Sequence, residues 1–224
     1  MNNYYSLLQK NPLFSGIPVE EINQLCQCLS AREKTFSQGA FVFHAGDPVR
    51  TLYLILSGRM DIIDEDFWGN RSIVETLPTH TLFGEAYVFA AASKYLVSVV
   101  AAEDAILLEI DPARLLKPCR QVCPCHARLV RNTVDILAEK IVRLTEKLGH
   151  VTRRTTREKT LSYLSQCARR EKRNSFSIPY SRQQLADYLC VDRSALSHEL
   201  RKLQDEGVLH YRKNQFSLYQ INES

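Results

Sequence analysis

Residues 181–220 read SRQQLADYLCVDRSALSHELRKLQDEGVLHYRKNQFSLYQ, and this stretch decides the fold of the C-terminal part of the chain. Ser181 is expected to cap a first helix that runs through Leu189, because a serine side chain accepts a hydrogen bond from a free N–H group of the first turn. Asp192 is expected to cap a second helix in the same way, and Gly207 to end it. The runs VLHY and FSLYQ then form a hairpin around the sequence RKN. Helix, short turn, helix and hairpin together predict a winged helix-turn-helix.

The second helix of this motif carries polar side chains on faces that its apolar side does not use. A recognition helix enters the DNA major groove with its N-terminal end first, so Arg193, Ser194 and Ser197 are expected to meet base edges. Arg193 can donate two hydrogen bonds to one guanine. Basic side chains farther along the helix and on the hairpin suit phosphates, which set affinity rather than sequence preference. The predicted DNA-binding residues are therefore Arg193, Ser194, Ser197, His198, Arg201, Lys202, Arg212 and Lys213.

The charge of the chain is unevenly distributed. The formal net charge is +4, but residues 151–224 hold 14 Lys or Arg against 8 Asp or Glu, an excess of six. The remaining two thirds of the chain therefore carry a small negative charge. This distribution predicts that the C-terminal part binds a polyanion, which for this motif is double-stranded DNA. A winged helix that makes only protein contacts is the alternative, and the basic excess counts against it.

Length and composition limit the classes of protein to which the chain can belong. Its 224 residues allow one large or two modest domains, and 45% hydrophobic with 24% charged residues is ordinary for a soluble globular protein. Its apolar runs fall short of the roughly 20 residues that cross a bilayer, and its N-terminus lacks the pattern of a secretory signal. A cytoplasmic protein without a membrane partner is expected. No glycine-rich phosphate loop, nucleophile elbow or pair of metal-binding histidines is found, so an enzyme is not predicted.

The first half of the chain changes from helical to strand-like patterning. Residues 17–36 read as a short helix, with Pro18 in its first turn and Ile22, Leu25 and Leu29 at helical spacing. The short runs FVFHAG, TLYLILSG, RMDIIDE, RSIVETL, LVSVVA and AILLEID follow, separated by glycine and other turn formers. These runs predict an antiparallel barrel or jelly roll, and hence an α+β chain. A sandwich without a pocket fits nearly as well.

Residues 122–148 return to a helical period with a heptad pattern. Apolar residues are spaced 4, 3, 4, 3 and 4 apart, which is the a/d alternation of a coiled coil. We therefore predict a parallel homodimer seam, the alternative being one helix packed on its own domain. The predicted seam residues are Val130, Val134, Leu137, Ile141, Leu144 and Leu148. Gly149 is expected to end the helix or to begin a hinge.

The order of these elements, the sequence FGE at residues 83–85 and the block LADYLCVDRSALSHELRKLQDEGVL at residues 185–209 resemble the Crp/Fnr superfamily. The resemblance covers nearly the whole chain. It implies a cyclic-nucleotide-binding-like β-roll sensor domain at residues 1–121, a dimerisation helix at 122–149 and a winged helix-turn-helix domain at 150–224. It also implies a homodimer that binds a palindromic promoter site under the control of an effector and contacts RNA polymerase.

The chain departs from this family at the effector site. In cyclic-AMP-responsive members an Arg-Ser pair holds the cyclic phosphate, and the matching positions here are Tyr95 and Leu96. A buried phosphate needs a cation and hydrogen-bond donors, so cyclic AMP is not expected as the effector. The candidate effector pocket consists of Phe83, Gly84, Glu85, Tyr87, Tyr95 and Val97. Gly84 and Glu85 also suit a simple turn, the aromatic residues suit a packed core, and the effector stays unknown.

The cysteines offer a second hypothesis for the sensor. Cys119, Cys123 and Cys125 precede His126, and a thiolate-rich site for zinc, an iron–sulfur cluster or haem would use these ligand types. The spacing matches no common zinc motif, and buried cysteines often act only as small apolar residues. A cysteine-based metal or redox sensor with transcriptional output therefore remains the alternative function.

Overall fold

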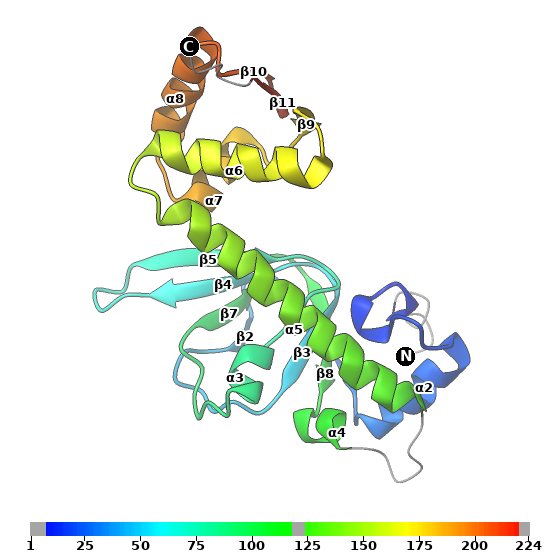
Figure 1. The fold of residues 1–224 in the computed structure, drawn as a ribbon. Helices are drawn as coiled ribbons and strands as arrows, with labels where there is room; N and C mark the ends of the chain where they lie inside the picture. The colour runs from blue at the N-terminus through cyan, green and yellow to red at the C-terminus, as the bar shows by residue number, and fades with distance from the viewer. Residues whose placement is uncertain (1–7, 118–123, 220–224) are drawn as a thin grey trace. The chain divides into compact units, whose positions relative to one another are not determined.

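The computed structural model describes residues 8–117 and 124–219. The chain divides into two compact units, residues 1–137 and 138–224. Figure 1 follows the helices and strands of each unit along the chain. Within the described ranges, none of the helices has the length and apolar character needed to cross a membrane.

The N-terminal segment packs on the start of the long helix α5 (Pro124–Val151) (Figure 1). It contains the 3₁₀ helix η1 (Pro12–Phe14) and helix α2 (Val19–Cys28), which buries Ile22, Leu25 and Cys26. The predicted helix over residues 17–36 was too long. The chain leaves the helix at Ser30, whose φ is 50°, and the following residues form strand β1 (Arg32–Phe36). All five residues of β1 pair with strand β8, so long-range pairing overrides the local helical pattern.

Two four-stranded antiparallel sheets form the β-roll. The first contains, in order, β1, β8 (Ala105–Ile110), β3 (Leu52–Ser57) and β6 (Leu82–Phe83). The second contains β2 (Phe41–Phe43), β7 (Ser98–Ala101), β4 (Met60–Glu65) and β5 (Arg71–Leu77). Ile55 and Leu107 from the first sheet share one buried core with Met60 and Val99 from the second. The predicted antiparallel roll and the α+β class are confirmed.

Gly84 connects the roll to a helix that the sequence did not predict. Its φ of 84° is a left-handed conformation, and a Cβ at this position would lie 3.1 Å from the carbonyl oxygen of Thr51. The expected turn at Gly84 is present, but Glu85 already begins helix α3 (Glu85–Phe89). A second short helix, α4 (Pro112–Leu116), follows β8 and is capped by the Asp111 side chain.

Helix α5 packs on the roll unit through one face of its N-terminal half. Leu129 is fully buried in the core, and the Asn132 side chain donates hydrogen bonds to the carbonyl oxygens of Leu13 and Ser15, each at 2.9 Å. Gly149 does not end the helix as expected, because α5 continues through it to Val151. The alternative, that Gly149 begins a hinge, stays a prediction. One glycine inside a long helix costs only about 1 kcal/mol.

The second unit carries the predicted winged helix-turn-helix. Its elements are α6 (Thr156–Glu171), β9 (Ser175–Ser177), α7 (Arg182–Leu189), α8 (Arg193–Asp205), β10 (Leu209–Arg212) and β11 (Gln215–Leu218). The strands form one antiparallel sheet in the order β10, β11, β9. Leu185 and Leu189 of α7, Leu196 and Leu200 of α8 and Phe216 of β11 meet in a single core.

The helix ends in this unit follow the sequence signals closely. The Ser181 hydroxyl accepts a hydrogen bond from the N–H of Gln184, and the Gln184 side-chain oxygen accepts one from the Ser181 N–H. Asp192 caps α8, and Gly207 with a φ of 71° lies just past its end. Cys190 occupies the turn between α7 and α8 in a left-handed conformation, with a φ of 51°. The predicted caps are confirmed.

Candidate nucleic-acid interface

The N-terminal end of α8 is fixed by its cap. The Asp192 carboxylate accepts hydrogen bonds from the N–H groups of Ser194 at 2.7 Å and Ala195 at 3.0 Å, and from the Ser194 hydroxyl at 2.5 Å. These bonds, that from the Ser194 side chain first, lower the pKa of Asp192. The cap holds Arg193 as the first residue of the helix.

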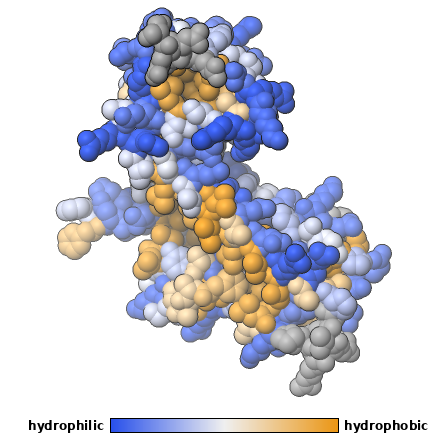
Figure 2. Space-filling view, viewed as in Figure 1, coloured by the Kyte–Doolittle hydropathy of each residue, from blue (hydrophilic) through white to orange (hydrophobic). Residues whose placement is uncertain are grey.

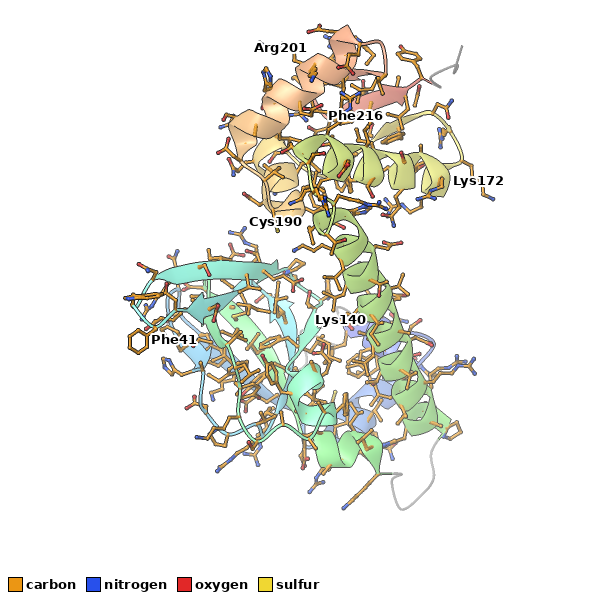
Figure 3. The ribbon with its side chains drawn as sticks, turned by 60° about the vertical axis from the view of Figure 1, so that its left-hand side comes forward. Phe41, Lys140, Lys172, Cys190, Arg201 and Phe216 are labelled. Carbon is orange, nitrogen blue, oxygen red and sulfur yellow. The ribbon has the colours of Figure 1, made fainter. Side chains whose placement is uncertain are left out.

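The faces of α8 separate apolar from polar side chains. Leu196, Leu200 and Leu203 are fully buried. Among the predicted DNA-binding residues of this helix, Ser197 is half-buried and the others are exposed: Arg193, Ser194, His198, Arg201 and Lys202. Figure 3 labels one residue of each kind, Arg201 on α8 and Phe216 on β11. Arg201 is exposed, whereas Phe216 is buried in the core.

The two serines of the predicted base-reading set already use their hydroxyl protons within the helix. Ser194 donates to Asp192, and Ser197 donates to the carbonyl oxygen of Arg193 at 2.9 Å. Each hydroxyl can still accept a hydrogen bond. The Arg193 guanidinium forms no ion pair within the described residues, so its N–H donors are available to a base. Arg193 is therefore the main candidate for base contact.

The wing is held by an arginine that sequence reasoning missed. Arg212 and Lys213 are exposed at the turn between β10 and β11, and Lys213 has a φ of 54°. The guanidinium of Arg182 lies 5.0 Å from the ring centroid of Tyr211 and donates to the Lys213 carbonyl oxygen at 3.4 Å. Burial lowers the pKa of Arg182. An arginine at the start of a helix reads as a surface charge, and only the folded wing shows that it packs against aromatic rings.

The interior of the roll is filled by aromatic side chains from both sheets. Tyr95 stacks on Phe43, with ring centroids 3.6 Å apart, and Tyr53 stacks on Phe83 at 5.1 Å. The Tyr95 hydroxyl donates to the carbonyl oxygen of Thr51 at 3.3 Å. Burial raises the pKa of Tyr53 to about 12 and also raises the pKa of Tyr95, so both phenols stay neutral at physiological pH.

Two of the other predicted pocket residues, Gly84 and Tyr87, lie beside this aromatic stack. Glu85 is buried, while Gly84, Tyr87 and Val97 are half-buried. Tyr87 meets Tyr95 edge to face, with centroids 5.3 Å apart. The structure thus brings Phe83, Gly84, Tyr87 and Tyr95 together, and their role as an effector pocket stays a prediction. Leu96, the second position matched to the Arg-Ser pair, is 76% exposed and faces away from this interior.

The predicted seam residues of α5 form an apolar stripe that is largely exposed in the single chain. Val130 and Leu137 are half-buried, whereas Val134, Ile141, Leu144 and Leu148 are exposed. Figure 2 shows hydrophobic side chains along α5 (Figure 2). A helix that stays exposed to water does not need an apolar stripe. Exposed apolar surface of this kind is typical of a contact site.

The cysteine hypothesis falls partly outside the described residues. Cys119 and Cys123 lie there, whereas Cys125 is buried and its thiol donates to a Glu21 carboxylate oxygen at 2.6 Å. Cys26 is buried in the same core, and burial, followed by the charge of Glu33, raises its pKa to about 11. In the described part of the chain no cluster of three potential ligands for a metal ion occurs. A metal site at Cys119, Cys123 and Cys125 stays a prediction.

Comparison with known proteins adds two family matches. Residues 33–121 match the model of the cyclic nucleotide-binding domain, and residues 158–222 match that of the Crp-like helix-turn-helix domain. The chain is 25% identical over 202 residues to the cyclic AMP receptor protein of Thermus thermophilus, covering 90% of this chain and 89% of the relative. It is also 25% identical over 183 residues to the CRP-like protein Clp of Xanthomonas euvesicatoria pv. vesicatoria, covering 80% of each.

Solved structures share the fold. The c-di-GMP-responsive regulator CLP of Xanthomonas campestris has a TM-score of 0.58 at 22% identity, over 91% of this chain and 100% of that one. CprK in complex with OCPA has a TM-score of 0.65 at 15% identity, over 92% of each chain. At these identities the likeness extends to the fold alone.

Proposed function

The chain belongs to the Crp/Fnr superfamily of DNA-binding transcription regulators, and from that premise we propose that it binds a palindromic promoter site as a homodimer under the control of an effector other than cyclic AMP. A cyclic nucleotide-binding domain joined to a Crp-like helix-turn-helix domain is the arrangement of such regulators. RNA polymerase is then the expected protein partner, and the cytoplasm, where the promoters are, the expected location.

The observation that carries the proposal is the exposed polar face of α8. Its capped N-terminal end presents Arg193, and its buried leucines fix which side faces the domain core. Arg193 is proposed to read a guanine, with Ser194, Ser197 and His198 beside it. Arg201 and Lys202, together with Arg212 and Lys213 on the wing, are proposed to contact phosphates.

The exposed stripe of α5 supports the homodimer. Two copies that pair along Ile141, Leu144 and Leu148 would cover apolar surface that one chain leaves in water. A two-fold symmetric pair presents two recognition helices to two half-sites, which is why the site is expected to be palindromic. We accordingly propose the division into a sensor domain at residues 1–121, a dimerisation helix at 122–149 and a DNA-binding domain at 150–224.

The aromatic interior of the roll supports an effector other than cyclic AMP. One relative is named a cyclic AMP receptor protein and another is described as c-di-GMP-responsive, so nucleotide effectors are a precedent among similar proteins. In this chain Tyr95 matches one position of the Arg-Ser pair with which cyclic-AMP-responsive members hold the phosphate, and its hydroxyl donates a hydrogen bond to the carbonyl oxygen of Thr51. A neutral phenol does not replace the cation that a buried phosphate needs.

The proposal is tested by selecting binding sites for the full-length protein from a pool of random DNA duplexes. The account expects an inverted repeat with half-sites about 10 base pairs apart, centre to centre, or a multiple of that spacing, bound by two chains. If the pool shows no enriched sequence, or one chain binds a single unrepeated site, the proposed function is wrong.

A further inference from the structure

Arg157 connects the first helix of the DNA-binding domain to the recognition helix at two points. Its guanidinium donates one hydrogen bond to Glu199 Oε1 at 3.2 Å and another to Glu206 Oε2 at 2.6 Å. Glu199 lies within α8, and Glu206 is the residue directly after its last turn. Seven residues separate the two carboxylates, which corresponds to two helical turns, or roughly 10 Å along the axis.

The first turns of α6 also hold the turn that precedes α8. The Lys159 ammonium donates to the Cys190 carbonyl oxygen at 3.2 Å. A capping box formed by Thr155 and Glu158 orders the same helical turn. Lys159 therefore contacts the chain just before α8, and Arg157 contacts α8 in its middle and at its end.

The environment of Arg157 favours a fixed geometry. Its side chain is 33% exposed and that of Glu199 is 16% exposed, so solvent screens this pair less than a pair on the open surface. A guanidinium presents its donors in a planar fork, which can bind two carboxylates at once in a defined orientation. The hydrogen bond from Arg157 lowers the pKa of Glu206, so this carboxylate stays charged.

The leucines of α8 alone leave part of its orientation undetermined. Burial of Leu196, Leu200 and Leu203 fixes the face of the helix that meets the core, but apolar contacts are not directional. Glu206 moreover lies at the C-terminal end of α8, where the helix dipole disfavours a negative charge. The Arg157 guanidinium, as a cation at this point, therefore stabilises the end of α8 and sets the direction of the helix.

We propose that Arg157 is a positioning residue for DNA recognition, which sets the orientation of α8 by binding Glu199 and Glu206. This inference rests on the proposed reading of DNA by α8. The inference predicts a change in DNA affinity that is opposite to the usual effect of removing a carboxylate. Removing a carboxylate from a DNA-binding domain ordinarily strengthens binding, because it reduces repulsion of the phosphates. Here the removal of Glu206 or Glu199 weakens sequence-specific binding.

The test uses the full-length protein and two duplexes, one enriched by the wild-type protein from a random pool and one with that sequence scrambled. The variants are Arg157→Ala, Arg157→Lys, Glu199→Ala and Glu206→Ala, with Arg169→Ala as the matched loss of an exposed cation on the same helix. Affinity is measured over a range of salt concentrations, and thermal unfolding is followed by circular dichroism to confirm that each variant is folded. If the wild-type protein enriches no sequence, the proposed function fails before this inference is tested.

Arg157→Ala is expected to lower affinity for the enriched duplex about tenfold, comparable to losing part of one bidentate base contact, with an unchanged salt slope. Glu199→Ala and Glu206→Ala are expected to lower it in the same direction, and Arg157→Lys to stay below the wild-type protein because one ammonium cannot span both carboxylates. Arg169→Ala should leave the ratio of the two affinities unchanged.

The inference is overturned if Glu206→Ala binds as tightly as the wild-type protein or more tightly, if Arg157→Lys restores full affinity, or if Arg157→Ala lowers the salt slope by about one, which would mark a phosphate contact.

Discussion

The winged helix and the β-roll of this chain differ in how their proposed binding residues are brought together. In the winged helix, most of the predicted DNA-binding residues lie on one helix, within ten positions of one another, and a single side chain, Asp192, caps that helix. In the roll, Phe43 on β2, Tyr53 on β3 and Tyr95 before β7 meet only because two sheets face each other.

This difference has a consequence for what each region can bind. The side chains of α8 are exposed in the folded chain and need only a groove of the right width, so their partner follows from a general motif. The aromatic side chains of the roll already satisfy one another by stacking, and Tyr95 also hydrogen-bonds Thr51. The DNA-binding region therefore indicates its ligand, whereas the packing of the sensor region does not identify an effector.

The largest expected effect concerns the exposed stripe on α5, which belongs to neither binding region. Leu144 is 60% exposed, so Leu144→Asp should leave the folded chain intact but bury an unpaired charge in the dimer seam. A loss of about 3–5 kcal/mol in association free energy is expected, with monomers in sedimentation experiments.

Arg143→Asp is the control for that variant, because Arg143 is exposed on the same helix outside the stripe and forms a surface ion pair with Glu139. It should remain a dimer. Dimers of Leu144→Asp at the same protein concentration would show that the seam lies elsewhere.

A smaller effect is expected in the winged helix, where substitutions of two neighbouring residues distinguish its core from its DNA-binding face. Leu200→Ala removes a fully buried side chain and should lower the free energy of unfolding by about 2–5 kcal/mol. Arg201→Ala should change that free energy by less than about 0.5 kcal/mol while weakening DNA binding at low salt. Chemical denaturation and DNA titration measure the two quantities. Equal losses of stability in both variants would remove the distinction between the faces.

The cap of α8 gives the comparison a pH dependence. Hydrogen bonds lower the pKa of Asp192 below its unfolded value, so its contribution to stability is present above the unfolded pKa of roughly 4 and is lost as the pH falls through the folded pKa. The protection of the amides at the start of α8, measured relative to their intrinsic exchange rates at each pH, should decrease in acid. In Asp192→Asn, which can still cap the helix, this part of the acid response should disappear. An identical acid response in both proteins would contradict the assignment.

The smallest expected effect lies in the roll, where cyclic AMP should do nothing. Millimolar cyclic AMP is expected to leave both the DNA affinity and the thermal unfolding temperature unchanged, because the proposed match of Tyr95 to the phosphate-binding pair puts a neutral phenol where a cation is needed. A rise in unfolding temperature that saturates with cyclic AMP would show that the aromatic interior does accept a nucleotide.

Local signals in the sequence were sufficient for much of the fold. Ser181, Asp192 and Gly207 mark helix boundaries through hydrogen bonds or backbone conformations that involve only nearby residues, and the structure confirms all three. Strand β1 was missed because four of its five residues are exposed and show no alternation, so only pairing with β8 defines it. Gly149 was misread as a helix end, because α5 continues through it to Val151.

The candidate sites show the same limit. The exposed set on α8 followed from helical spacing, but the contacts of Arg157 with α8 and of Arg182 with Tyr211 join residues 29 to 49 positions apart. Nothing in the local sequence distinguishes these arginines from the exposed ones. Ion pairs and cation–π contacts across a domain depend on its tertiary structure, which a single sequence does not display.

The most direct test of the central claim compares Arg193→Ala with the wild-type protein on the enriched duplex and on its scrambled counterpart. The account predicts a loss of about 1–3 kcal/mol on the enriched duplex, relaxed preference at one base position and nearly unchanged binding to the scrambled duplex. Equal losses on both duplexes would contradict it, because they would make Arg193 a phosphate contact and remove the base-reading role from the start of α8.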